Sequence, residues 1–145
     1  MRSYQKAIQK GRKDGLKKDL AAALVKMAPC FQVGEYRLKG RSEYQFLFPE
    51  VNQEVRRGPI KFYRPDVVWF SGGLSEDDAT VIFEIEDGTS PKHQMGGLVF
   101  ANILALRLDK PIWFFAIGAE GSEIASNAIA LLKKYLQSKW ILKPL

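Results

Sequence analysis

The stretch VIFEIEDGTSPKHQ, residues 81–94, decides the fold of this 145-residue chain. Its branched and aromatic residues predict a β-strand from Thr80 to Glu86. The sequence TSP at 89–91 supplies a helix N-cap and a proline near the first helical position, so a helix is predicted from there to Leu108. A strand that turns directly into a capped helix is typical of a parallel β-α-β crossover.

The remaining elements are predicted from hydrophobic periodicity. An amphipathic helix is expected over Leu16–Met27, with apolar residues at positions 16, 20, 23, 24 and 27. The polar residues 1–15, which contain Gly11 and Gly15, are expected to form a flexible basic arm or a short separate helix. The other segments are a hairpin or loop at 35–43, an extended run at 44–55, strands at 60–70 and 111–118, and a last helix at 122–139. The strand at 111–118 is almost wholly apolar, which is typical of the middle of a sheet.

This order of elements predicts a single α/β domain over residues 1–145, with an antiparallel first half and a parallel crossover in the second half. One cysteine and one histidine exclude an intrachain disulfide and a cysteine zinc cluster, and argue against a Ser-His-Asp triad. We see neither a membrane-length apolar run nor a secretory leader, so we expect a soluble cytoplasmic protein without a membrane partner.

Charge is distributed unevenly along the chain. Residues 1–64 carry a net charge of +9, whereas residues 65–145 carry −3. This asymmetry is typical of a protein whose first half contacts a polyanion, although basic residues also serve solubility alone. Phosphate contacts are expected from Lys10, Arg12, Lys13, Lys17 and Lys18, and from a second group nearer the acids described next, namely Lys39, Arg41, Arg56, Arg57, Lys61 and Arg64.

Four acidic residues are predicted to converge from three successive strands. Glu84 and Glu86 share one face of the 80–86 strand, Asp66 interrupts the apolar run FYRPDVVWF, and Glu50 follows the apolar run FLF. Carboxylates held together repel one another unless a cation such as Mg²⁺ or Mn²⁺ lies between them. The simpler alternative is that the two glutamates of the strand face water.

The spacing of these acids resembles a known family. Arg64-Pro65-Asp66, followed after seventeen residues by Glu84-Ile85-Glu86, resembles the PD-(D/E)XK nuclease superfamily, and the likeness covers roughly residues 16–120. The resemblance implies a restriction-endonuclease-like α-β-β-β-α-β core with a mixed central sheet flanked by helices. It also implies Mg²⁺-dependent (or Mn²⁺-dependent) hydrolysis of DNA with no small-molecule cofactor. A homodimer would supply the two sites needed to cut both strands.

Roles carry over from this resemblance residue by residue. Asp66 and Glu84 match the metal-binding pair, and Glu50 is a candidate for an additional acid. Glu86 stands where most members have lysine, so it would complete the metal site or activate water, and Lys92 or Lys61 would replace the missing lysine. In the following helix, Gly96 and Gly97 indicate close packing of helix on sheet, or else room for a DNA backbone.

Two alternatives to a nuclease remain open. A non-catalytic nucleic-acid-binding protein would keep the fold and bind DNA with steep salt dependence, without cleaving it. A protein-interaction module would use the acidic patch against a basic partner and would show neither a metal effect on stability nor DNA affinity.

Overall fold

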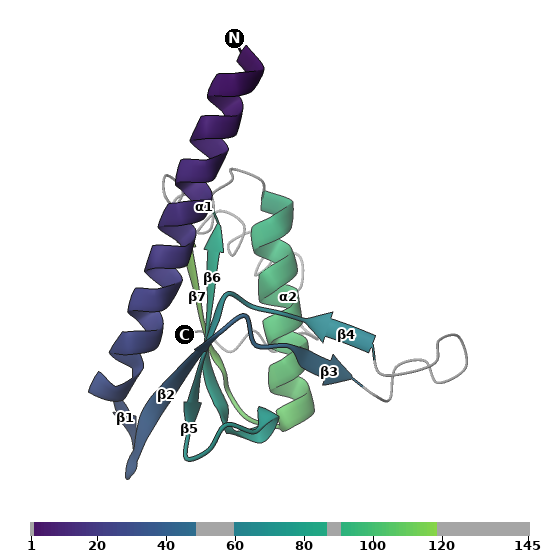
Figure 1. Cartoon of the computed structure of the whole chain (residues 1–145). Helices are drawn as coiled ribbons and strands as arrows, with labels where there is room; N and C mark the ends of the chain where they lie inside the picture. Colours follow the sequence, from purple (N-terminus) through teal and green to yellow (C-terminus); the bar gives the residue numbers. More distant parts are fainter. Residues whose placement is uncertain (1, 49–59, 87–90, 119–145) are drawn as a thin grey trace.

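The computed structural model describes residues 2–48, 60–86 and 91–118 (Figure 1). These residues form a mixed α/β fold. Its helices and strands, in chain order, are α1 (Arg2–Met27), a short 3-10 helix (Ala28–Cys30), β1 (Gln32–Val33), β2 (Tyr36–Ser42), β3 (Phe46–Phe48), β4 (Ile60–Tyr63), β5 (Val67–Ser71), a second 3-10 helix (Glu76–Asp78), β6 (Ala79–Glu86), α2 (Pro91–Leu108) and β7 (Trp113–Gly118).

Five of the strands form one mixed sheet in the order β1-β2-β5-β6-β7. The pairs β1–β2, β2–β5 and β5–β6 are antiparallel, and β6–β7 is parallel. Helix α2 makes the crossover between β6 and β7, as the stretch at 81–94 predicts. The hairpin β1–β2 turns at Gly34, whose φ of +58° is a conformation that glycine adopts without strain.

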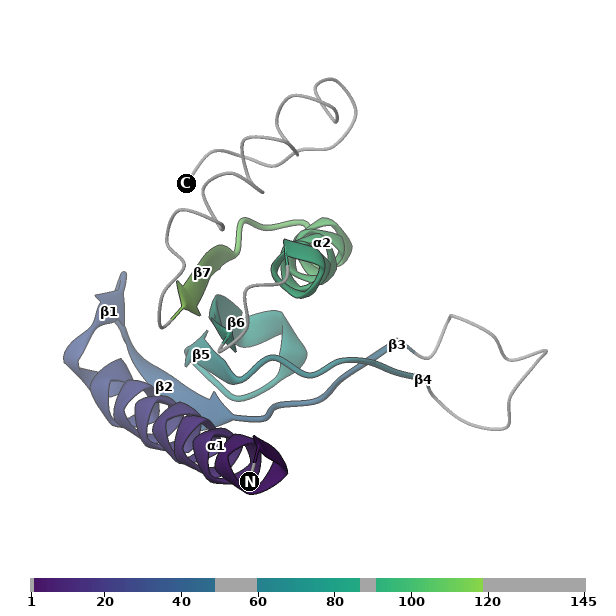
Figure 2. The ribbon, with the colours of Figure 1, turned by 90° about the horizontal axis from the view of Figure 1, so that it is seen from above.

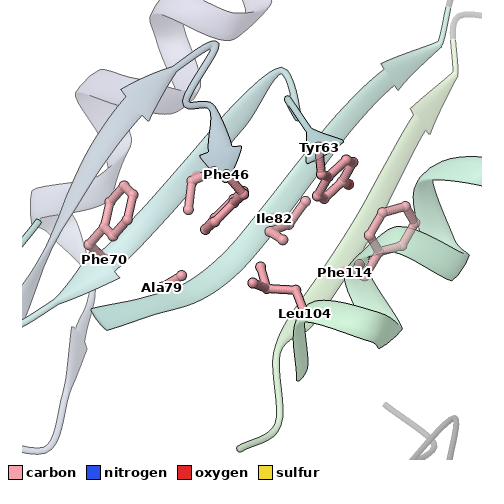
Figure 3. Packing of buried hydrophobic residues seen from close by; sticks show 9 residues of the cluster. Phe46, Tyr63, Phe70, Ala79, Ile82, Leu104 and Phe114 are labelled. Carbon is pink, nitrogen blue, oxygen red and sulfur yellow. The ribbon is translucent and has the colours of Figure 1, made fainter. Parts of the chain in front are cut away.

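The two helices cover opposite faces of this sheet (Figure 2). One face of β5 and β6 packs with α2 in a core that contains Val68, Phe70, Ile82 and Leu104, and several of its side chains are drawn in Figure 3. The opposite face packs with α1 in a second core, whose buried members are Leu24, Ala28, Leu38, Val67, Trp69, Val81, Phe83 and Ile85. Strand β6 is therefore covered on both faces, and Glu84, which the simpler alternative placed in water, is partly buried.

Helix α1 is longer than predicted and turns a different side to the sheet. It begins at Arg2, so the prediction of a flexible arm or a separate short helix before Leu16 is wrong. Each glycine inside a helix costs only about 1 kcal/mol, and the packed second half of the helix provides the nucleus that isolated helices lack. The sheet-facing residues are Leu20, Ala21, Leu24 and Val25, followed by Ala28 of the adjoining 3-10 helix, whereas Leu16 and Met27 of the predicted face are exposed.

The predicted strand at 60–70 is two strands rather than one. β4 ends at Tyr63 and β5 begins at Val67, with the buried Pro65 between them. Proline cannot donate a ladder hydrogen bond and restricts the residue before it, which explains the break. β4 pairs with β3 in a separate two-stranded hairpin, and β5 pairs with β2.

Strand β7 is also placed differently from the prediction. It is the last strand in the order among the described residues, not a middle strand, and side chains of Trp113 and Phe115 are about half exposed. The predicted helix at 122–139 and most of the extended run at 44–55 lie outside the described residues.

Candidate functional site

Asp66 occupies the bend between β4 and β5 and joins three elements through its side chain. Its Oδ2 accepts a hydrogen bond from the backbone N–H of Ile85 in β6 at 2.7 Å. Its Oδ1 lies 3.2 Å from Nζ of Lys17 in α1. The pairing of β5 with β6 ends at Val67 and Phe83, so the carboxylate takes the place of a main-chain acceptor for the next part of β6.

The side chain of Glu84 lies on the face of β6 that α2 covers, whereas α1 covers the other face. Its Oε1 accepts a hydrogen bond from the hydroxyl of Tyr63 at 2.7 Å. Gly97 of α2 passes so close that a Cβ at that position would lie 3.1 Å from Cγ of Glu84. Gly97 therefore fits the prediction of close helix-on-sheet packing, whereas a Cβ at Gly96 would meet nothing within 4 Å.

The negative charges of Glu84 and Asp66 both affect the pKa of Tyr63. Burial raises the pKa of its hydroxyl, and the charge of Glu84, the hydrogen bond to Glu84 and the charge of Asp66 raise this pKa further. The Tyr63 hydroxyl therefore remains protonated and acts as a hydrogen-bond donor to Glu84 throughout the physiological pH range.

Asp66 and Glu84 lie at the same end of the sheet. Asp66 binds the backbone N–H of the residue that follows Glu84, so the two acids are neighbours across β5 and β6. This is the end at which β6 and β7 finish and α2 begins (Figure 1). The first turn of a helix presents unpaired N–H groups and a partial positive charge, which suit an anionic ligand.

The other predicted catalytic residues are placed only in part. Glu86 is the last residue of β6, two positions beyond Glu84 and therefore on the same face of the strand. Lys92 lies in the first turn of α2, at the same end of the sheet. Glu50 lies outside the described residues.

The predicted DNA-binding residues are spread over a wider surface than the acids. Arg64 is exposed next to Pro65, and Arg41 lies in β2 opposite Val68. Lys39 pairs with Phe70, further along β5 from Asp66, and is close enough to Asp78 to help lower the pKa of that acid. Lys61 belongs to β4, while Arg56 and Arg57 lie outside the described residues.

Sequence reasoning missed the two side chains that hold the acids in place. Tyr63 precedes Asp66 by three residues, and a tyrosine beside a predicted acid site is a signal for a buried hydroxyl donor. Lys17 was grouped with phosphate-binding residues. Its position three, four and seven residues before Leu20, Ala21 and Leu24 places it on the sheet-facing side of α1.

Asp66 and Glu84 carry carboxylate oxygens, the ligand type that hard divalent cations prefer. Within the described ranges there is no group of three or more His, Cys, Asp or Glu that could hold a metal ion. Mg²⁺ is often bound by one or two carboxylates, with water and substrate oxygens completing its shell. A cation on Oδ1 of Asp66 would compete with the ammonium group of Lys17.

Comparisons with known proteins found no relatives: no family model matches the chain, and neither a curated protein nor a solved structure matches it. A search of the described helices found none that is both long enough and apolar enough to cross a membrane.

Proposed function

We propose that the protein is a divalent-cation-dependent endonuclease that hydrolyses DNA phosphodiester bonds. The observation that carries this proposal is that Asp66 and Glu84, which are separated by seventeen residues, lie at the same end of the sheet, where Asp66 accepts a hydrogen bond from the backbone N–H of the residue after Glu84. Two carboxylates beside a lysine and a helix N-terminus are the groups that metal-assisted phosphoryl transfer requires.

The arrangement of elements supports a restriction-endonuclease-like core. When the β3–β4 hairpin and the short β1 are left out, the order is α1-β2-β5-β6-α2-β7, the α-β-β-β-α-β order that the superfamily resemblance implies. In this comparison Asp66 immediately precedes the second core strand and Glu84 lies in the third.

Each residue then has a definite task. Asp66 and Glu84 would hold Mg²⁺ or Mn²⁺ through their oxygens, with Glu86 and Glu50 as the proposed additional acids. The cation would supply polarisation of a phosphoryl oxygen and stabilisation of the developing negative charge. Tyr63 fixes the orientation of Glu84, and Lys92 or Lys61 is proposed to stand in for the lysine that Glu86 replaces.

A non-catalytic DNA-binding protein is the second candidate, and one observation favours it. Both oxygens of Asp66 already have partners, Ile85 N–H and Lys17, so the acid is stabilised without a cation. In that case Asp66 would hold α1 and β6 together, and the protein would bind DNA without cutting it.

The test is cleavage of supercoiled plasmid and of a synthetic four-way junction in Mg²⁺, Mn²⁺ or EDTA. The wild type should cut in the presence of either metal but not in EDTA, and Mg²⁺ should raise its melting temperature. Glu84→Gln should abolish both effects. The matched control is Glu35→Gln, the same chemical change at an exposed turn between β1 and β2, which should leave both effects intact.

Each result decides between the candidates. Retention of full cleavage by Glu84→Gln would refute the proposed site. Metal-independent DNA binding by the wild type, with neither cleavage nor a metal-dependent rise in melting temperature, would establish the second candidate.

A further inference from the structure

The first half of α1 extends past the end of the sheet that carries Asp66 and Glu84 (Figure 1). Residues 2–18 contain seven Lys and Arg residues against one acid, Asp14. Because the helix is continuous from Arg2 to Met27, the residues in this projecting half have fixed positions around the same axis as the packed half.

The basic residues of the projecting half fall on two different sides of the helix. Arg2, Lys6, Lys10, Lys13 and Lys17 follow one another at intervals of four, four, three and four residues, which places them along one side. We call this set the basic stripe. Arg12, Lys18 and Lys26 occupy positions on the opposite side of the helix, so Arg12 and Lys18, which the sequence alone groups with the phosphate contacts, lie away from the stripe.

The basic stripe continues the sheet-facing side of α1. Its last member, Lys17, forms the ion pair with Asp66, and the same side continues into Leu20, Leu24 and Ala28, which pack on the sheet. The side of α1 that is apolar over the sheet is therefore basic where the helix passes beyond the sheet, next to the candidate site.

We propose that the basic stripe binds the phosphate backbone of duplex DNA and positions it beside Asp66 and Glu84. This inference rests on the proposed function for its choice of DNA as the substrate. The stripe from Arg2 to Lys17 is about 22 Å long at the rise of an α-helix, a length over which a duplex carries about a dozen phosphate charges.

Composition favours a duplex over an anionic membrane. Helices that bind membrane surfaces combine a basic face with a broad apolar face. Residues 2–15 have only Tyr4, Ala7 and Ile8 as apolar or aromatic residues, apart from their two glycines. Binding by phosphate contacts alone would fix the position of the duplex without reading its sequence.

The test compares two triple variants of the full chain that lose the same charge. Lys6→Gln, Lys10→Gln and Lys13→Gln remove three stripe charges, whereas Arg12→Gln, Lys18→Gln and Lys26→Gln remove three from the opposite side. Binding to a 30-base-pair duplex is measured by fluorescence anisotropy in EDTA at several salt concentrations, and folding is checked by circular dichroism.

In the stripe variant, the negative slope of log K against log salt should become shallower by about 2.7, because each lost phosphate contact contributes about 0.9 to its magnitude. At 0.1 M salt this corresponds to affinity weakened by roughly 500-fold, whereas the control should lose less than about tenfold. Equal losses in the two variants, or an unchanged slope in the stripe variant, would overturn the inference. So would a stripe variant that binds DNA normally but no longer sediments with vesicles containing anionic lipid.

Measurement in EDTA separates this inference from the proposed function. Stripe-dependent binding by a protein that never cleaves DNA would support the inference and refute the nuclease. Metal-dependent cleavage by a protein whose stripe variant binds DNA normally would support the nuclease and refute the inference.

Discussion

Replacing Gly97 with alanine should destabilise the protein, whereas the same change at the neighbouring Gly96 should stabilise it. Both residues lie inside α2, where alanine is favoured over glycine by about 0.8–1.0 kcal/mol. At Gly96 a new Cβ would meet nothing within 4 Å. At Gly97 it would lie 3.1 Å from Cγ and 3.3 Å from both Cδ and Oε1 of Glu84.

The size of the difference follows from how tightly Glu84 is held. Its side chain must move by a few tenths of an ångström to admit the methyl group, away from a 2.7 Å hydrogen bond with Tyr63. A strained rotamer costs about 0.5–1.5 kcal/mol, and a charged hydrogen bond is worth about 1.5–3 kcal/mol when wholly lost. We therefore expect the two alanine variants to differ in unfolding free energy by about 2 kcal/mol.

The assay is urea unfolding at pH 7, followed by circular dichroism, in the wild type and in a Glu84→Ala background. Without the Glu84 side chain, alanine at position 97 should recover the full helix-propensity gain, so the double-mutant cycle should show a coupling of about 2 kcal/mol. If Gly97→Ala stabilises the wild type as much as Gly96→Ala does, Glu84 is not held in place and the reasoning is refuted.

Gly40→Ala should destabilise the protein by about 1–3 kcal/mol in the same urea assay, because its Cβ would lie 2.8 Å from the main-chain Cα of Val25 and would push α1 away from β2. Gly15→Ala is the control: a Cβ there would meet nothing within 4 Å, so this variant should be neutral or stabilising. The hydroxyl of Ser75 donates a hydrogen bond to Oδ2 of Asp78 and holds the pKa of that carboxyl below its usual range. An acid with a lowered pKa stabilises the fold above its unfolded-state pKa, and this contribution is lost as pH falls through the folded-state pKa. Ser75→Ala should therefore raise the pKa of Asp78 in an NMR titration, and an unchanged pKa would contradict the assigned cause.

The strand β6 and the helix α2 were predictable because their signals are local. Branched residues, the TSP cap and the apolar run all lie within a few residues of the elements they define. The sequence also predicted that Asp66 and Glu84 lie near each other, because successive strands in a short antiparallel run usually pair.

The errors came from interactions between distant parts of the chain. Packing of the second half of α1 on the sheet carries the helix through Gly11 and Gly15, which local propensity treats as breaks. Pro65 was visible in the sequence, yet the apolar residues on both sides of it suggested one continuous strand. The partnership of Lys17 with Asp66 depends on which side of α1 faces the sheet, and the exposed Leu16 and Met27 obscured that side.

The environment of Trp69 makes it an optical reporter for the docking of α1. Its indole N–H donates a hydrogen bond to the carbonyl of Leu24 at 3.0 Å, and its ring packs against Phe31 and Phe83. That carbonyl belongs to the last turn of α1, where backbone acceptors lack helical partners. Separation of α1 from the sheet would expose the buried indole of Trp69 to water and shift its emission to longer wavelength, whereas Trp113 is already half exposed. Fluorescence of a chain with Trp69 as its sole tryptophan would therefore distinguish release of this helix from unfolding of the sheet.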